Sequence, residues 1–189
     1  QKKKSNDLLN ASQKMLKTFG SNCCVNKLFY FEFYAVEIFG KTKMGQKLLY
    51  AKQGEDRAKM KEIACTIRPA IINLIKSQNI DSIVFVPPTV PRQIQFMKVL
   101  ESELALSLAN IEVLKVIGDV RVPQKTLKKI EDRIENAQNT FVVNNKAKFK
   151  TTLIIDDAVG SGASINQIAC KLTRAQHTQS VIGFSVTGS

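Results

Sequence analysis

Residues 153–164 constrain this chain most, because they place an acidic pair and a glycine-rich turn directly after a buried strand. Residues 153–155 form a short apolar run, which is typical of a strand covered on both faces. Asp156 and Asp157 follow at the expected end of the strand, and residues 160–164 form a small Gly/Ser-rich turn. Apolar residues then recur with the spacing of one helix face: Ile165, Ile168, Ala169 and Leu172. The stretch therefore predicts a strand, an acidic pair, a loop and a helix start.

This order of features suits a phosphorylated sugar. Glycines let backbone amides approach a phosphate closely, and a helix N-terminus adds free N–H donors and a partial positive charge. Ser161 and Ser164 add hydroxyl donors. Asp156 and Asp157 can accept hydrogen bonds from ribose hydroxyls and can hold Mg²⁺ directly or through water. The combination predicts a ribose 5-phosphate site.

Other phosphate-binding motifs fit less well. The Walker loop needs a lysine before its last hydroxyl residue, and residues 160–164 contain no lysine. The dinucleotide fingerprint requires a third glycine where Ile165 stands. The simplest alternative is an ordinary strand–turn–helix unit whose two aspartates are only solvated, and this alternative stays open.

The rest of the chain alternates between predicted strands and predicted helices. Strands are expected over residues 28–39, 46–51, 82–86, 112–117, 141–143 and 181–186, and helices over residues 8–19, 55–78, 92–109 and 128–139. Pro69 is expected to kink or split the second helix. The alternation predicts an α/β fold with a mostly parallel twisted sheet and helices on both faces. We expect one domain over residues 1–189, with residues 1–52 as an N-terminal strand and helix extension or hood and residues 53–189 as the core.

Three segments are expected to meet at one edge of this sheet, since ligands bind at the carboxyl ends of parallel strands. They are residues 87–92, the loop 118–129 and residues 156–164. The phenylalanines at 29, 31 and 33 alternate along another predicted strand. Such a row can stack nucleic-acid bases, but packing against a helix is the more common use.

Composition restricts the remaining choices. The chain has 189 residues and a net charge of +12, which is compatible with a nucleic acid, an anionic surface or a polyanionic small molecule, or simply with a lysine-rich surface. No apolar run approaches the ~18 residues of a membrane span, so no membrane partner is expected. The cysteines are Cys23, Cys24, Cys65 and Cys170, and their spacing indicates neither a zinc site nor a disulfide framework. Scattered thiols of this kind suit the cytoplasm, with Cys65 and Cys170 as small core residues.

The stretch Ile154-Ile155-Asp156-Asp157-Ala158-Val159-Gly160-Ser161-Gly162-Ala163-Ser164 resembles the phosphoribosyl-pyrophosphate (PRPP) motif of the type I phosphoribosyltransferases. The segments Val84-Phe85-Val86-Pro87-Pro88 and Gln124-Lys125-Thr126-Leu127, followed by Arg133, Asn136 and Phe141, resemble the competence protein F group and the amidophosphoribosyltransferases. The likeness covers about residues 45–187.

The resemblance implies transfer of a phosphoribosyl group from PRPP to a nitrogen nucleophile, with Mg²⁺ as cofactor and release of pyrophosphate. Asp156 and Asp157 would hold the ribose hydroxyls and the metal, directly or through water, and would also be the catalytic residues. The implied PRPP-binding set is Asp156, Asp157, Ala158, Gly160, Ser161, Gly162, Ala163 and Ser164. The implied pyrophosphate and lid residues are Pro88, Thr89, Arg92, Arg121, Lys125 and Lys128. The loop cations are equally compatible with solvated surface charge, and His177 is expected to have no catalytic part.

The sequence departs from the family pattern in places. Gly160 stands where many members have threonine, the usual four-cysteine zinc ribbon is absent, and Arg92-Gln93-Ile94-Gln95-Phe96 replaces the usual segment after the Val-Pro strand. These departures leave the acceptor unknown. Two hypotheses therefore compete. The first is a cytoplasmic transferase that acts on PRPP and a small-molecule acceptor. The second is a non-catalytic PRPP- or nucleotide-binding protein linked to DNA uptake or DNA metabolism. Weak nucleic-acid binding and a homodimer are compatible with both.

Overall fold

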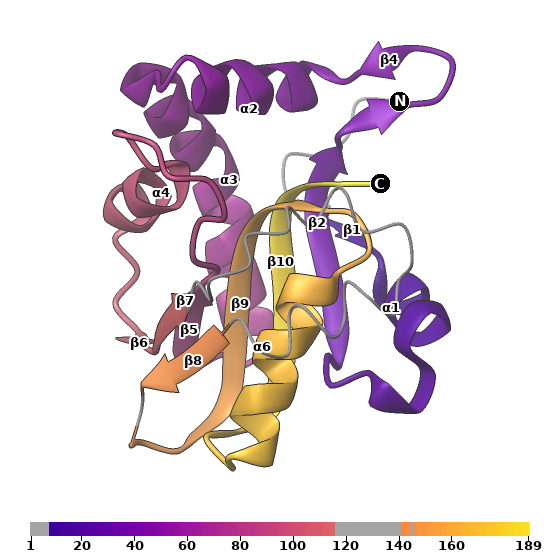
Figure 1. The fold of residues 1–189 in the computed structure, drawn as a ribbon, viewed down its shortest axis with the longest axis vertical. Helices are drawn as coiled ribbons and strands as arrows, with labels where there is room; N and C mark the ends of the chain where they lie inside the picture. Colours follow the sequence, from indigo (N-terminus) through magenta and orange to yellow (C-terminus); the bar gives the residue numbers. More distant parts are fainter. Residues whose placement is uncertain (1–7, 116–140, 145) are drawn as a thin grey trace.

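The computed structural model describes residues 8–115, 141–144 and 146–189. Its centre is a six-stranded sheet in the order β1-β2-β10-β9-β5-β6 (Figure 1). All neighbours in this sheet run parallel except β1 and β2, which are antiparallel. The strands are β1 (Leu9–Asn10), β2 (Lys27–Phe33), β5 (Ser82–Phe85), β6 (Ala109–Asn110), β9 (Phe149–Val159) and β10 (Thr178–Gly188). The predicted α/β class with a mostly parallel sheet is confirmed.

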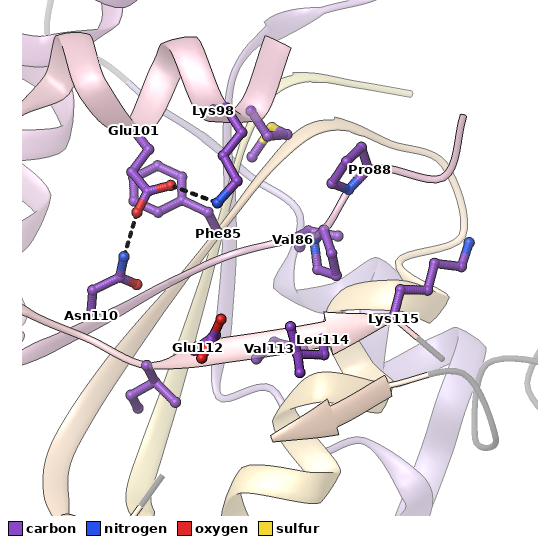
Figure 2. A pocket seen from close by; sticks show the side chains of 13 residues that line it. Phe85, Val86, Pro88, Lys98, Glu101, Asn110, Glu112, Val113, Leu114 and Lys115 are labelled. Carbon is purple, nitrogen blue, oxygen red and sulfur yellow. Dashed lines mark hydrogen bonds and ion pairs between the residues drawn. The ribbon is translucent and has the colours of Figure 1, made fainter. Parts of the chain in front are cut away.

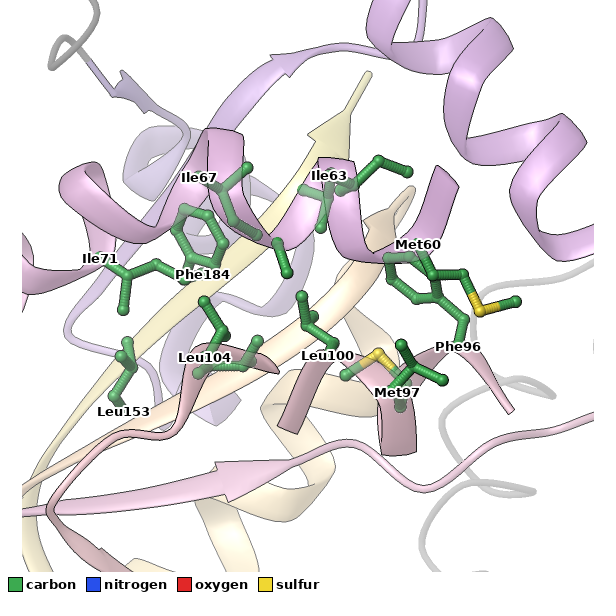
Figure 3. Packing of buried hydrophobic residues seen from close by; sticks show 14 of the residues in the cluster. Met60, Ile63, Ile67, Ile71, Phe96, Met97, Leu100, Leu104, Leu153 and Phe184 are labelled. Atoms are coloured by element: carbon green, nitrogen blue, oxygen red, sulfur yellow. The ribbon is translucent and has the colours of Figure 1, made fainter. Parts of the chain in front are cut away.

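Three helices cover one face of the sheet: α2 (Lys43–Gln53), α3 (Arg57–Ser77) and α4 (Phe96–Leu104). Their apolar side chains pack against those of β9 and β10 that point to this face, including Leu153 and Phe184 (Figure 3). In α3 the buried residues recur at helical spacing, as expected: Met60, Ile63, Ala64, Ile67, Ala70, Ile71 and Leu74. This layer anchors the central strands from one side.

Helices α1 (Ser12–Phe19) and α6 (Ala163–Arg174) cover the opposite face. Ile154 of β9 and Val181 of β10 lie in this second core together with Ile165 and Ile168 of α6. A short 3₁₀ turn, η1 (Gly20–Asn22), follows α1. Both faces of the sheet are therefore covered, and β9 has apolar side chains on each face, as its continuous apolar run predicts.

The predicted strand over residues 46–51 is wrong, because this segment lies within α2. The Thr42 hydroxyl accepts a hydrogen bond from the Gly45 amide at 3.0 Å and caps this helix. Met44, Leu48 and Ala51 bury one helical face. Pro69 does not split α3, which is one helix of 21 residues.

Several element boundaries also differ from the predictions. The predicted strand 28–39 ends at Phe33, and β3 (Ala35–Val36) and β4 (Gly40–Lys41) form a small separate hairpin. The helix predicted over residues 92–109 is confined to α4, and the helix predicted over residues 8–19 begins only at Ser12. Phe29 and Phe31 pack against the hydrophobic core under α2, α3 and α4, which supports packing rather than base stacking as their role.

Two predicted strands do not join the main sheet. Strands β7 (Glu112–Lys115) and β8 (Phe141–Asn144) pair with each other as an antiparallel hairpin. The helix predicted over residues 128–139 lies outside the described residues. After β5 and α4, the chain therefore contributes only the two-residue strand β6 to the parallel sheet.

A disulfide joins Cys24 to Cys170. The expectation that neither would be in a disulfide is wrong for this pair, which the sequence hides because the two residues are 146 positions apart. Cys65 is exposed on α3 and is not the core residue that was expected. The bond ties the segment after η1 to α6, and the Asn166 side chain reinforces it by accepting from the Cys24 amide at 2.8 Å.

Among the residues that the structure describes, no helix combines the length and apolar character needed to cross a membrane.

Candidate functional site at the carboxyl edge of the sheet

The acidic pair lies at the carboxyl end of β9, between β5 and β10. Asp156 is opposite Ser185 of β10, and Ile155 is opposite Phe85 of β5. The Val86 amide donates a hydrogen bond to the Ile155 carbonyl at 2.9 Å. This bond holds the start of the segment 87–92 directly beside the acidic pair.

The two aspartates point to opposite faces of the sheet, because both lie within β9 and side chains alternate along a strand. Asp156 shares the face of Ile154, which is packed under α6, whereas Asp157 shares the face of Ile155, which is packed under α3. The Asp156 carboxylate also accepts a hydrogen bond from the Asp157 amide at 2.8 Å. The pair is therefore two separate acceptors rather than one shared anionic pocket.

Lys52, in the last turn of α2, forms an ion pair with the Asp157 carboxylate. Both side chains are partly shielded, with exposed fractions of 34% and 20%. Sequence reasoning missed Lys52, because it treated this segment as a strand and because 105 positions separate it from Asp157. The protein itself, through Lys52, thus places a positive charge beside Asp157.

Burial raises the pKa of Asp156 to about 7, and the negative charge of Asp157 adds to the increase, while the Asp157 amide and Lys52 oppose it. Near neutral pH the site therefore carries less than two full negative charges. A protonated Asp156 can also donate a hydrogen bond, which an ionised carboxylate cannot do.

This pKa predicts how stability depends on pH. An unfolded aspartate has a pKa of about 3.9, so between about pH 4 and 7 the folded chain binds more protons than the unfolded chain. The contribution of Asp156 to the free energy of unfolding should therefore decrease as pH rises through this window. Asp156→Asn removes the contribution and should be more stable than the wild type at about pH 7.5 by about 1–2 kcal/mol, allowing for the partial exposure of the group.

Urea denaturation of the wild type and of Asp156→Asn at about pH 4.5, 6 and 7.5 measures this difference. Glu62→Gln is the control, since Glu62 is an exposed carboxylate on α3 paired with Lys47 at 2.5 Å. The stability gap between wild type and Asp156→Asn should widen with pH. A constant gap across the three conditions would contradict the raised pKa.

The glycine-rich turn leads directly into α6. Gly162 is the N-cap residue with φ of 80°, a left-handed conformation that favours glycine. A Cβ at this position would lie 2.3 Å from the Met15 sulfur of α1. No acidic residue lies in the first helical turn, and the N-cap has no side-chain oxygen. Within the described part of the chain, the first amides of α6 have no side-chain partner other than a long 3.4 Å contact from the Ala163 amide to the Ser161 hydroxyl, an arrangement that suits an anion.

Two buried hydroxyls on β10 lie next to the acidic strand end, and sequence reasoning missed both. Ser185 is opposite Asp156, and its hydroxyl donates to the Thr187 carbonyl at 2.8 Å. Thr187 is opposite Ala158, and its buried hydroxyl has no hydrogen-bond partner within the described part of the chain. An unpaired buried hydroxyl is costly unless water or a ligand satisfies it.

The remaining predicted residues are distributed as follows. Pro88 and Thr89 are exposed on the segment after β5, and Arg92 is partly exposed further along it. Arg121, Lys125 and Lys128 lie outside the described residues. His177 is at the opposite edge of the sheet, where its carbonyl accepts from the Phe149 amide at 2.8 Å.

A cavity of about 330 Å³ lies between β5 and β7, where the two strands diverge beside α4 (Figure 2). Pro88 lines it, whereas none of residues 156–164 does. Its walls combine apolar side chains with five polar or charged ones, and Glu101 joins Lys98 and Asn110 at its rim. The cavity thus adjoins the segment after β5 and is separate from the acidic pair and the glycine-rich turn.

The described residues contain no cluster of three or more His, Cys, Asp or Glu side chains that could hold a metal ion. Because their side chains lie on opposite faces of β9, Asp156 or Asp157 could ligate a metal ion directly, but not both together, and Lys52 already neutralises Asp157. A Mg²⁺ ion commonly uses one or two carboxylates together with substrate oxygens and water. The site therefore fits a metal that arrives with a phosphorylated substrate, rather than one held by protein ligands alone.

No protein-family model and no curated protein matches the sequence. Among solved structures, the chain is similar to a hypoxanthine phosphoribosyltransferase from Staphylococcus aureus, at 15% sequence identity and a TM-score of 0.39. The match covers 70% of this chain and 65% of that structure, and hence less than two thirds of the latter's length.

Proposed function

We propose that the carboxyl edge of the sheet binds PRPP and that the chain transfers its phosphoribosyl group to a nitrogen nucleophile. The observation that carries the proposal is the junction of β9 and α6. An acidic strand end, a left-handed Gly162 and a helix start without a side-chain cap follow one another within eight residues (156–163). This order offers acceptors for ribose hydroxyls at one end and amide donors for the 5-phosphate at the other.

In the proposed reaction the bond from ribose C1 to the pyrophosphate oxygen breaks, the bond from C1 to the acceptor nitrogen forms, and the nitrogen loses a proton. The sugar becomes cationic as pyrophosphate leaves. Asp156, on the face of β9 that α6 covers, would orient the ribose when it is ionised, and the negative charge of Asp157 on the other face would stabilise the cationic sugar through its field. The Ser161 hydroxyl, the backbone of residues 160–164 and the unpaired Thr187 hydroxyl are candidates for the phosphate end. Mg²⁺ would neutralise the pyrophosphate oxygens when bound.

Pro88, Thr89 and Arg92 are the proposed contacts for pyrophosphate, because their segment begins beside Ile155. Arg121, Lys125 and Lys128 stay predictions for a closing loop. The competence protein F-like grouping, the homodimer and the cytoplasmic location also stay predictions. A disulfide such as Cys24–Cys170 is more common outside the cytoplasm, which weighs against the last of these.

A non-catalytic PRPP- or nucleotide-binding protein is the second candidate function. The Lys52–Asp157 ion pair favours it, because a carboxylate already neutralised by a lysine stabilises a cationic sugar less. Under this hypothesis the acidic pair and the glycine-rich turn bind PRPP or a nucleotide without catalysis, and the protein acts as a sensor.

The test is PRPP binding by calorimetry, with and without Mg²⁺. We expect binding at millimolar PRPP or below and a higher affinity with Mg²⁺, since the cation offsets the charge of pyrophosphate near Asp156 and Asp157. A thermal shift under the same conditions provides an independent measurement. Absence of heat and of a thermal shift at millimolar PRPP with Mg²⁺ would remove the transferase and the PRPP-binding form of the second candidate, and would leave only binding of another nucleotide.

A further inference from the structure

The amino-terminal edge of the sheet, opposite the candidate site, carries a cluster of cations. We call it the basic edge, and it comprises Lys76, Lys146, Lys148, Lys150, Lys171 and Arg174. The three middle lysines occupy alternate positions leading into β9, and the others lie in the last turns of α3 and α6. In Figure 1 the chain between β8 and β9 and the end of α6 lie at the same end of the molecule.

Hydrogen bonds hold these segments together. The Phe149 amide donates to the His177 carbonyl at 2.8 Å, which joins the start of β9 to the chain after α6. The amides of Lys150 and Thr151 donate to the Asp81 carboxylate at 2.9 and 3.0 Å, which joins β9 to the chain after α3. The cations therefore lie along one edge of the sheet, with Lys76 on the side of α3 and with Lys171 and Arg174 on the side of α6.

The residues that the structure describes do not balance the positive charge of this surface with ion pairs. Within the described residues, none of the six cations forms an ion pair, and five are exposed while Lys171 is partly exposed. Asp81 is the carboxylate on these segments, and both of its oxygens are bound to backbone amides. Favourable helix dipoles explain Lys76, Lys171 and Arg174, but they do not explain Lys146, Lys148 and Lys150.

We infer that the basic edge binds the phosphate backbone of a nucleic acid. Lysines that neutralise phosphates release counterions, which drives binding without base recognition. A membrane surface would also attract lysines, but peripheral membrane binding normally adds apolar side chains that insert into the lipid. The most exposed large apolar residues of the described chain, Ile38 and Phe39, lie near the β3–β4 hairpin, and none of the exposed large apolar residues is in residues 146–150 or 171–177, although Val142 on β8 precedes them. The surface therefore fits a polyanion better than a lipid.

The basic edge and the PRPP site are at opposite ends of the strands, so both ligands can bind at once. The inference does not rest on the proposed function, and PRPP binding and nucleic-acid binding can fail independently. The inference also specifies which part of the chain, whose net charge is +12, binds the nucleic acid.

The experiment measures binding of a labelled 20-nucleotide single strand and of a 20-base-pair duplex to the full chain between about 25 and 200 mM salt. Lys146→Glu/Lys148→Glu is the test variant. Lys41→Glu/Lys43→Glu is the matched control, because these two exposed lysines on β4 and α2 change the net charge equally but lie outside the basic edge. We expect the test variant to lose about 10–100-fold in affinity at low salt and the control less than about 3-fold.

The salt slope gives a second measurement. Neutralising two phosphate contacts with Lys146→Gln/Lys148→Gln should reduce the slope of log K against log salt by about 1.4 on the single strand and about 1.8 on the duplex. Thermal melting of each variant checks that it is folded, and the Gln pair replaces the Glu pair if the latter is not. Equal losses in test and control variants, no binding of either oligonucleotide at low salt, or binding to phosphatidylserine vesicles without oligonucleotide binding would each overturn the inference.

Discussion

Replacing Asp157 with asparagine is expected to slow pyrophosphate release by about 10²-fold while weakening PRPP binding far less. Asparagine keeps the size of the side chain and its hydrogen-bonding atoms but removes one negative charge. If that charge stabilises the cationic sugar, its effect is larger in the transition state than in the ground state and appears in kcat. Loss of one such electrostatic contributor typically costs about 10²-fold.

Glu62→Gln is the matched control for this variant. Both substitutions neutralise a carboxylate that is paired with a lysine of α2, Lys52 in one case and Lys47 in the other. Exposed ion pairs contribute about 0–1 kcal/mol to stability. The Lys52–Asp157 pair is partly shielded, but the asparagine oxygen can still accept a hydrogen bond from Lys52, so neither variant should unfold. A kcat for Asp157→Asn equal to that of Glu62→Gln would contradict a catalytic role for Asp157. Parallel losses in binding and turnover would assign the residue to binding alone.

Replacing Gly162 with alanine is expected to destabilise the protein by about 2–4 kcal/mol and to weaken PRPP binding. The left-handed backbone at φ of 80° disfavours any Cβ, and the added atom would collide with the buried Met15 sulfur. In a chain of this size the destabilisation corresponds to a fall in Tm of about 5–15 °C. The affinity for the 5-phosphate of PRPP should also decrease, because Gly162 sets the position of the first amides of α6.

Gly160→Ala is the control, since among the described residues no heavy atom beyond its chain neighbours lies within 4 Å of the position of its Cβ. It should change stability by no more than about 0.5 kcal/mol. Met15→Ala combined with Gly162→Ala should be less destabilised than the sum of the two single variants, because the clash is relieved. Equal melting temperatures for Gly160→Ala and Gly162→Ala would show that Gly162 does not constrain the start of α6.

The sequence predicts the central unit of the fold well because its signals are local. Residues 153–155 are apolar on consecutive positions, as a doubly covered strand requires, and Ile165, Ile168 and Leu172 repeat at helical spacing. The α/β class follows from the same reasoning, since alternating elements lead to a parallel sheet. The apolar face of α3 was predicted in the same way, and the helix continues through Pro69, which lies on its exposed side.

The errors arise where a long-range contact decides the outcome. The apolar cluster Leu48-Leu49-Tyr50 suggests a strand, but the Thr42 cap and the core contacts of Leu48 and Ala51 make it helical. Because of that error, the sequence analysis did not predict that Lys52 forms an ion pair with Asp157. The Cys24–Cys170 disulfide joins residues 146 positions apart and has no spacing signature.

The candidate site was anticipated in its parts but not in its geometry. The sequence places Asp156, Asp157 and the glycine-rich turn in order, yet it suggests that the two carboxylates act together. The extension of β9 to Val159 places them on opposite faces of the sheet instead. The raised pKa of Asp156 and the unpaired hydroxyl of Thr187 also depend on burial against neighbouring strands, which the sequence does not reveal.

Pyrophosphate release from PRPP tests the central claim most directly. The wild-type chain is incubated with PRPP and Mg²⁺ and with a panel of nucleobases and amines, and Asp157→Asn is measured in parallel. The account predicts acceptor-dependent release of pyrophosphate by the wild type and release about 10²-fold slower by Asp157→Asn. Tight binding of PRPP without release of pyrophosphate with any acceptor would contradict the transferase proposal and leave the sensor as the function.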